Sequence, residues 1–172
     1  VQKALMPRSS HHGPIRSVMK SCWHPQHVYR GYGCMSEEKA ALRRSLRKQR
    51  FSTVQLQAES ACICEQLRKL PLFQQARCIA AYMPLPHEAQ IQPLVSEILA
   101  DGKCLLLPSV SDNGLTFHQV SRLQSLREGQ FRVMEPPEDA LQVPLEQAEL
   151  ILVPLEAVDR RGNRLGKGGG YY

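Results

Sequence analysis

Three short apolar runs, separated by helical or turn-rich segments, constrain the fold of this chain more than any other feature. They are Cys78–Met83, Cys104–Leu107 and Glu149–Val153. Each run is too short for a buried helix. Each also lacks the alternation of apolar and polar residues that is typical of a strand with one solvent-exposed face, so each has the pattern of a strand that is buried on both faces. The runs therefore predict the interior strands of a covered sheet.

A helix is predicted between the first two runs. Gln90–Ala100 places its apolar residues at helical spacing, and Gly102 follows near the position where helices commonly end. Strands that alternate with helices predict an α/β fold with a largely parallel sheet, covered on both faces. Asp112–Gly114, followed by Leu115–Val120, is instead the signal of a turn and a hairpin.

Two further helices are predicted before the first strand. Ser36 can cap a helix over Glu37–Arg50. Ser52 and Gln55 have the spacing of a capping box, which predicts a second helix that runs to about Leu70.

Residues 1–34 differ in composition from the rest of the chain. They are rich in Pro, Ser, His and Gly, and neither a helical nor a strand period persists in them. We therefore expect residues 1–34 to be a disordered or non-native extension, with Met35 as the functional start. Residues 35–172 are then long enough for one domain with one core.

The net charge of +6 lies mostly in this extension, which holds five Lys and Arg residues and no acidic residue. From Met35 onward, 17 basic residues face 16 acidic ones, which argues against nucleic-acid binding by the folded part. Nucleic-acid binding by residues 1–34 remains the alternative. The chain has no run of about eighteen apolar residues and no start of signal-peptide type, so we expect a soluble, cytoplasmic protein without a membrane partner.

The strongest local signal for a binding site is the glycine-rich segment 159–172, which begins soon after the strand ending at Val153. Its glycines let the backbone approach a ligand, and consecutive N–H groups in such a loop bind anions. Arg164 and Lys167 add two positive charges. Ligands of open α/β sheets bind beyond the carboxyl ends of strands, so the pattern predicts a polyphosphate site. A flexible tail is the alternative on the glycines alone.

A second candidate is the basic stripe on the first predicted helix, formed by Lys39, Arg43, Arg47 and Arg50. Eleven residues at about 100° each return to within about 20° of the starting direction, so the four cations share one side. Without carboxylates at matching spacings they repel one another, and a bound anion would relieve this repulsion. The alternative is a solvated charged face.

The third candidate is the loop Tyr82–Glu88, directly after the first strand. Its two prolines restrict its shape, and Glu88 can accept hydrogen bonds from N–H groups of a ligand. The alternative is an exposed loop with a solvated Glu88.

Together and in this order, these features resemble the 5-formyltetrahydrofolate cyclo-ligase family, also called methenyltetrahydrofolate synthetases. The resemblance spans residues 36–172 and is strongest in the terminal glycine block, whose triplet at 168–170 resembles the bacterial type. The other matching residues are Lys39, Leu42, Arg43, Leu46, Glu88, Leu107, Pro108, Gly129, Glu135, Pro136, Val153, Pro154, Asp159 and Gly162.

The resemblance implies a three-layer α/β sandwich with a mostly parallel, Rossmann-like sheet. Lys39 and Arg43 match positions that bind ATP. The terminal loop matches the ATP loop of the family, through Arg164, Leu165, Gly166, Lys167, Gly168, Gly169, Gly170, Tyr171 and Tyr172. Met83, Glu88 and Tyr171 match positions that contact the folate.

The implied reaction converts 5-formyltetrahydrofolate and ATP into 5,10-methenyltetrahydrofolate, ADP and phosphate through a phosphorylated formyl group. Phosphoryl transfer depends on positioning and charge neutralisation. We therefore expect Lys39, Arg43, Arg164 and Lys167 to hold the phosphates, with Lys167 and Arg164 as the catalytic residues.

Magnesium is the implied metal, bound in the family by an Asp that follows the double tyrosine, so no metal ligand is expected within residues 1–172. The resemblance thus implies a domain that is incomplete at its C-terminus. A monomer is expected. The alternative function is an inactive fragment of such an enzyme with residual nucleotide binding.

Overall fold

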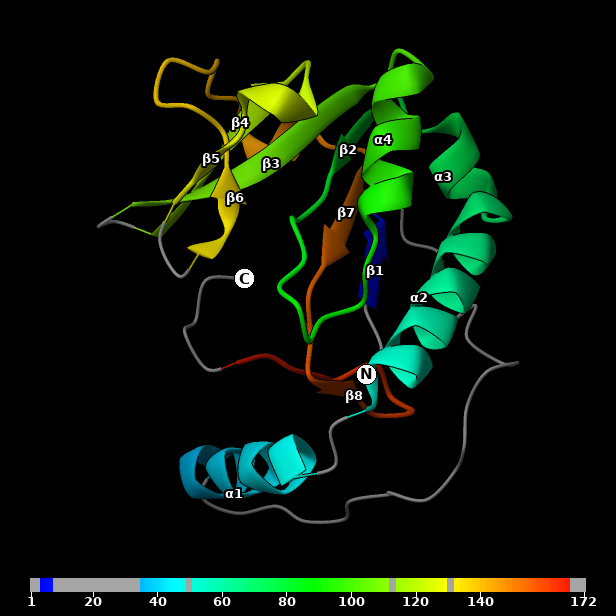
Figure 1. Ribbon diagram of the computed structural model, residues 1–172, viewed down its shortest axis with the longest axis vertical. Coiled ribbons are helices and arrows are strands. Elements are labelled where there is room, and N and C mark those ends of the chain that lie inside the picture. The colour runs from blue at the N-terminus through cyan, green and yellow to red at the C-terminus, as the bar shows by residue number, and fades with distance from the viewer. Residues whose placement is uncertain (1–3, 8–34, 49–50, 112–113, 130–131, 168–172) are drawn as a thin grey trace.

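The protein is described by a computed structural model that covers residues 4–7, 35–48, 51–111, 114–129 and 132–167 (Figure 1). Its centre is a five-stranded sheet with the order β1-β7-β2-β3-β4. The three inner strands are mutually parallel: β7 (Leu150–Val153), β2 (Cys78–Ala80) and β3 (Cys104–Ser111). Antiparallel strands border them, so the α/β class is confirmed with a mixed sheet that is parallel at its centre.

Alternate residues of the inner strands contribute to two separate apolar clusters, one on each face of the sheet. One cluster contains Ile79, Leu105 and Leu150, all fully buried. The other contains Ala80, Leu106 and Ile151. Burial on both faces explains why these strands are continuous apolar runs in the sequence.

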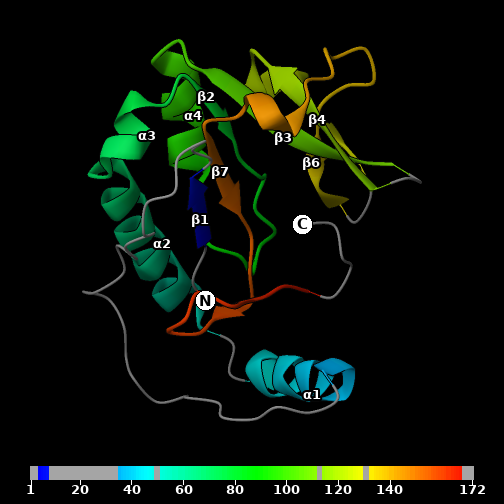
Figure 2. The same cartoon turned by 180° about the vertical axis from the view of Figure 1, so that it is seen from behind.

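Helices α2 (Thr53–Arg68), α3 (Pro71–Gln75) and α4 (Gln92–Ala100) pack on one face of the sheet (Figure 1). The other face is packed by Val143, Ala148 and the 3₁₀ helix η3 (Leu145–Gln147), which Figure 2 brings into view. Among the described residues, this second covering layer consists of the 3₁₀ helix and the segments that connect it to the sheet. Helix α1 (Met35–Lys48) lies apart, below the sheet in Figure 1.

The predicted helix ends agree closely with the observed ones. The Ser52 hydroxyl accepts from the Gln55 N–H at 3.3 Å, and the Gln55 side chain accepts from the Ser52 N–H at 3.0 Å, which confirms the capping box of α2. Gly102, with a φ of +68°, follows the last turn of α4 in the left-handed conformation. Helix α1 begins at Met35, before the predicted start, and residues 49–50 of its predicted end lie outside the described residues.

Two strands differ in length from the prediction. β2 ends at Ala80, and the chain then leaves the ladder although Tyr82 and Met83 remain buried. β3 continues through Pro108 to Ser111, because β4 (Gly114–Val120) pairs with it along this whole stretch. This pairing confirms the predicted hairpin, whose turn residues 112–113 lie outside the described residues.

Strand β1 (Ala4–Pro7) forms an antiparallel pair with β7, in register from Ala4 opposite Val153 to Pro7 opposite Leu150. The segment that we expected to be an extension thus contributes four residues to the sheet. Residues 1–3 and 8–34 lie outside the described residues. No helix in the described part is both long and apolar enough to cross a membrane.

Two small ribbons and a 3₁₀ helix complete the fold. Strand β5 (Arg127–Glu128), which follows η1 (Leu123–Ser125), pairs with β6 (Met134–Glu135). Strand β8 (Ala157–Val158) pairs with β9 (Arg164–Leu165) just after the end of β7. The second ribbon carries the start of the glycine-rich segment to the site described next.

Candidate functional site

Three segments that are distant in sequence meet beyond the carboxyl end of the inner strands. Nε of Arg43, on α1, donates to the carbonyl oxygen of Gly166 at 2.7 Å. Nζ of Lys167 lies 3.2 Å from Oε1 of Glu88, in the loop after β2. The structure therefore brings together residues from all three candidate regions. They are Arg43 on the basic helix, Gly166 and Lys167 in the glycine-rich segment, and Glu88 in the loop after β2.

The β8–β9 hairpin is shaped by the carboxylate of Asp159. It accepts hydrogen bonds at 2.8 Å from the N–H groups of Arg161 and Asn163 and from the Asn163 amide, and Gly162 completes the turn with a φ of +86°. Asp159 is exposed, and its slight desolvation raises its pKa, but the hydrogen bonds from Asn163 and Arg161 outweigh this effect and hold the pKa below its usual value. Asp159 and Gly162 are therefore turn-forming residues that direct the chain toward Lys167.

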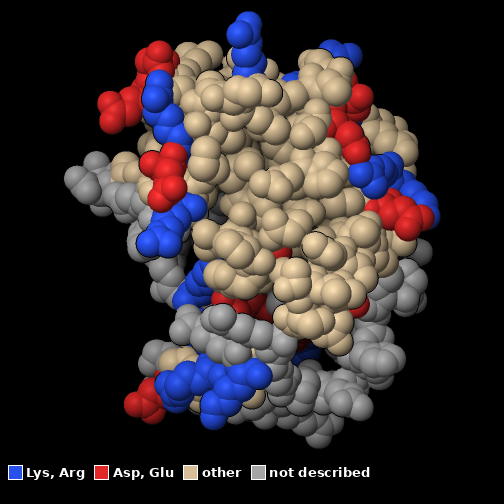
Figure 3. Space-filling view, viewed as in Figure 1, with Lys and Arg blue, Asp and Glu red and all other residues tan. Residues whose placement is uncertain are grey.

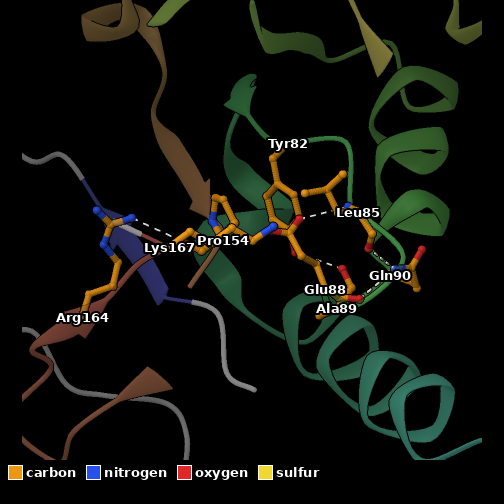
Figure 4. Close-up of polar contacts among 8 residues, drawn as sticks. All are labelled: Tyr82, Leu85, Glu88, Ala89, Gln90, Pro154, Arg164 and Lys167. Atoms are coloured by element: carbon orange, nitrogen blue, oxygen red, sulfur yellow. Dashed lines mark hydrogen bonds and ion pairs between the residues drawn. The ribbon is translucent and has the colours of Figure 1, made fainter. Parts of the chain in front are cut away.

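Arg164 ties this hairpin to the end of β7. Its guanidinium donates to the carbonyl oxygen of Pro154 at 3.3 Å, and the side chain is half-buried (Figure 4). Leu165 is the next residue, so its side chain points to the opposite face of β9. It is 7% exposed, and its burial anchors the strand. The Arg164 cation is thereby placed just beyond the last inner strand, where α/β folds bind ligands.

Glu88 lies in a loop that closes on itself. Its Oε2 accepts from the Leu85 N–H at 3.0 Å, and its own N–H donates to the Leu85 carbonyl at 2.9 Å. Oε1 faces Lys167, and the Glu88 side chain is only 10% exposed while that of Lys167 is 38% exposed (Figure 4). The carboxylate is thus held between a backbone donor and an ammonium group.

A set of hydrogen bonds that the sequence reasoning missed supports this loop. The Gln90 amide donates to the carbonyl oxygens of Leu85 at 2.8 Å and Glu88 at 2.7 Å, and the Tyr82 hydroxyl donates to that of Ala89 at 3.0 Å (Figure 4). The only signal in the sequence was that Tyr82 and Gln90, two residues with polar groups, stand at the two ends of this loop.

Other predicted site residues have fewer described contacts. Lys39 is exposed on α1, one helical turn before Arg43, and Met83 is 8% exposed within the core. Gly168, Gly169, Gly170, Tyr171 and Tyr172 lie outside the described residues. Figure 3 shows Lys and Arg gathered over α1, below a broad face with few charged side chains. In the described part, no three His, Cys, Asp or Glu side chains are grouped to hold a metal ion.

A second buried carboxylate, Glu135, lies beside β3 and is 7% exposed. Its Oε2 accepts from the Ser109 hydroxyl at 2.8 Å and from the Val110 N–H at 3.3 Å. Gly129 packs directly against it, since a Cβ at this glycine would lie 2.3 Å from Cδ of Glu135. Gly129 and Glu135 both belong to the residues that match the family, and their contact with each other gives a physical reason for both residue types.

Comparison with known proteins shows which family this chain resembles. Residues 35–172 match the model of the 5-formyltetrahydrofolate cyclo-ligase family. The chain is 29% identical over 145 residues to the 5-formyltetrahydrofolate cyclo-ligase of Haemophilus influenzae, a match covering 80% of this chain and 76% of the relative. It is 32% identical over 101 residues to that of Escherichia coli K12, covering 56% of each protein.

The solved structure of Aquifex aeolicus 5,10-methenyltetrahydrofolate synthetase superposes with a TM-score of 0.70 at 34% identity, covering 78% of this chain and 69% of that one. The chain thus spans between about half and three quarters of the length of these relatives. The family match, by contrast, extends from α1 to the last residue of the chain. This chain belongs to the 5-formyltetrahydrofolate cyclo-ligase family.

Proposed function

We propose that this chain converts 5-formyltetrahydrofolate into 5,10-methenyltetrahydrofolate with ATP and releases ADP and phosphate. The observation that carries the proposal is the 3.2 Å contact between Lys167 and Glu88, because it joins the glycine-rich loop to the carboxylate loop. A reaction between a nucleotide and a folate needs both binding regions at one place. Family membership supports the same reaction.

The nucleotide side of the site is assigned to the cations around the glycine-rich loop. Arg43 holds the start of this loop through the Gly166 carbonyl, and Arg164 stands at the end of β7. With Lys39 and Lys167, these side chains supply positive charge for the phosphates, and from the sequence we expect the N–H groups of residues 166–170 to add further donors. Tyr171 and Tyr172 complete the proposed ATP loop.

The folate side is assigned to Glu88 and Met83, with Tyr171 at the border between the two ligands. The Glu88 carboxylate can accept hydrogen bonds from N–H groups of the pterin ring. Its low exposure strengthens such bonds, because charge interactions gain strength away from water. Met83, which is 8% exposed, would add an adaptable apolar contact for the folate.

The chemistry requires activation of a weak leaving group. The formyl oxygen attacks the γ-phosphorus of ATP, the bond from that phosphorus to the bridging oxygen breaks, and ADP leaves. N10 of the folate then attacks the activated carbon and loses its proton to solvent, and the bond from that carbon to the former formyl oxygen breaks as phosphate leaves with this oxygen. Lys167 and Arg164 would stabilise the charge on the transferred phosphoryl group, and no nucleophilic side chain is needed.

Magnesium commonly neutralises nucleotide phosphates in such reactions. Magnesium is usually held by one or two carboxylates together with the phosphates themselves, and the described residues contain no group of three or more His, Cys, Asp or Glu side chains that would mark a site built by the protein alone. We therefore assign the residues above to binding and charge neutralisation and derive no step through the metal.

The test is direct. Purified protein is incubated with 5-formyltetrahydrofolate, ATP and magnesium, and the absorbance of the methenyl product is followed. Product formation that is abolished by Lys167→Met and kept by Lys69→Met supports the proposal, because Lys69 forms an exposed pair with Glu65 on α2. Nucleotide binding without product would instead support the inactive fragment with residual nucleotide binding. Failure to bind either ligand would refute both.

We further propose a cytoplasmic monomer. The folded part is nearly neutral, so its overall charge gives no reason to expect an acidic partner surface. Sedimentation of the purified protein at working concentration tests the monomer, and cell fractionation tests the location.

A further inference from the structure

The loop that carries Glu88 has no regular secondary structure, so its backbone groups need partners from elsewhere. The side-chain amide of Gln90 supplies two of them. Its nitrogen donates to the Leu85 carbonyl at 2.8 Å and to the Glu88 carbonyl at 2.7 Å, which uses both amide hydrogens. One side chain thereby closes the loop over residues 85–88.

Gln90 is itself anchored to α2 through its backbone. Its N–H donates to the Ser60 hydroxyl at 2.9 Å, and that hydroxyl in turn donates to the Leu56 carbonyl at 2.6 Å. The Cys64 thiol lies 3.6 Å from the Gln90 carbonyl oxygen and donates to it. Ser60 is only 3% exposed, so the anchor belongs to the packed part of the molecule. The amide thus connects a rigid helix to the loop.

We propose that Gln90 is a positioning residue for Glu88, and this inference rests on the proposed function of Glu88 as a folate contact. The Leu85 carbonyl accepts from both Gln90 and the Glu88 N–H, while the Leu85 N–H donates to the Glu88 carboxylate. Gln90 therefore holds the same residue that orients the carboxylate. Without the amide, the Glu88 side chain keeps its charge and loses its fixed direction.

The effect is expected to be local. The Tyr82 hydroxyl and the Gln90 N–H keep their own partners when the amide is removed, so the two ends of the loop stay attached. Only the turn over residues 85–88 loses its hydrogen bonds to the Gln90 amide. A positioning role therefore predicts a defect in folate binding that is larger than any loss of folding stability.

The test compares Gln90→Leu with Gln74→Leu. Gln74 also donates its amide to a backbone carbonyl, that of Arg68 at 2.8 Å, but at an exposed position on α3. We expect Gln90→Leu to raise KM for 5-formyltetrahydrofolate about tenfold while KM for ATP and kcat change little, since a contact made equally in the ground and transition states affects KM alone. Gln74→Leu should leave all three unchanged.

A double-mutant cycle separates positioning from a general structural role. If Gln90 acts through Glu88, Gln90→Leu should not raise KM for the folate any further in a Glu88→Gln background. Equal effects in both backgrounds, or a folate KM for Gln90→Leu that matches wild type, would overturn the inference while the proposed function stands.

The same comparison can be made without turnover, by titrating the protein with 5-formyltetrahydrofolate and measuring Kd from intrinsic fluorescence. If wild type binds the folate but makes no product, an equal Kd for wild type and Gln90→Leu overturns the inference, and a Kd about tenfold weaker for the variant supports it. A wild type that binds no folate would refute the proposed function and this inference together.

Discussion

Gly129→Ala is expected to destabilise the protein, and the reason can be read from one contact. A Cβ at this position would lie 2.3 Å from Cδ and 2.7 Å from Oε1 of Glu135. Glu135 cannot swing away freely, because Ser109 and Val110 hold its other oxygen at 2.8 and 3.3 Å. Relief of the clash must displace a buried carboxylate from its donors.

The expected loss of stability combines the cost of overpacking with the cost of weakened hydrogen bonds to Glu135. Overpacking in a filled site costs about 1–3 kcal/mol, and a hydrogen bond to a charged group contributes about 1.5–3 kcal/mol. Because part of the network can follow the displaced side chain, we expect a loss of about 2–4 kcal/mol in the free energy of unfolding. Backbone strain adds nothing, since among the described glycines positive φ values occur at Gly102, Gly114 and Gly162.

Urea unfolding, followed by circular dichroism, measures this loss, and the Glu135→Ala background isolates its cause. With the carboxylate removed, the added methyl group has space. Gly129→Ala should then be neutral or stabilise by up to about 1 kcal/mol, because alanine restricts the unfolded chain. A sign change between the two backgrounds is the expected result. The reasoning fails if Gly129→Ala costs the same in both, or changes stability by less than about 0.5 kcal/mol in wild type.

Four further outcomes are expected. Leu94→Ala should cost about 2–5 kcal/mol in urea unfolding, since this side chain on α4 is fully buried. Ser52→Ala should cost about 1 kcal/mol by removing the cap of α2, and Ser52→Asp should restore most of it. Arg43→Ala should weaken the binding of a non-hydrolysable ATP analogue in calorimetry about tenfold, whereas Arg44→Ala on the same helix should not. The hydrogen bond from Arg68 lowers the pKa of Glu97 below its ordinary value of 4.5, so the pair stabilises the fold above that pH. The stability difference between wild type and Glu97→Gln should therefore shrink as the pH falls below 4.5; a constant difference would contradict the assignment.

The parts of the fold that depend on neighbouring residues could be predicted from the sequence. The capping box of Ser52 and Gln55 involves residues three apart, and the apolar face of α4 follows from helical spacing. The length of β3 could not be predicted in this way. It extends through Pro108 because β4 pairs with it, and such pairing depends on the whole hairpin.

In the candidate site, too, single residues could be predicted from the sequence, whereas contacts between distant residues could not. The sequence indicated Glu88 and Lys167 separately, as a carboxylate in a loop and a cation among glycines. The Gln90 amide bonds to Leu85 and Glu88 could not be predicted, because these depend on how the loop folds back over itself. Glu135 likewise gained a physical role only when the structure placed it against Gly129.

Strand β1 has a practical consequence for work with this protein. Four residues that lie far before α1 in the sequence protect the outer side of β7, the strand that leads into the β8–β9 hairpin. A version shortened to begin at Met35 would expose the backbone donors and acceptors of β7 to other molecules, and unpaired edges of this kind promote aggregation. Poor solubility of such a shortened protein would then reflect the lost edge strand, and would carry no information about the catalytic competence of the domain.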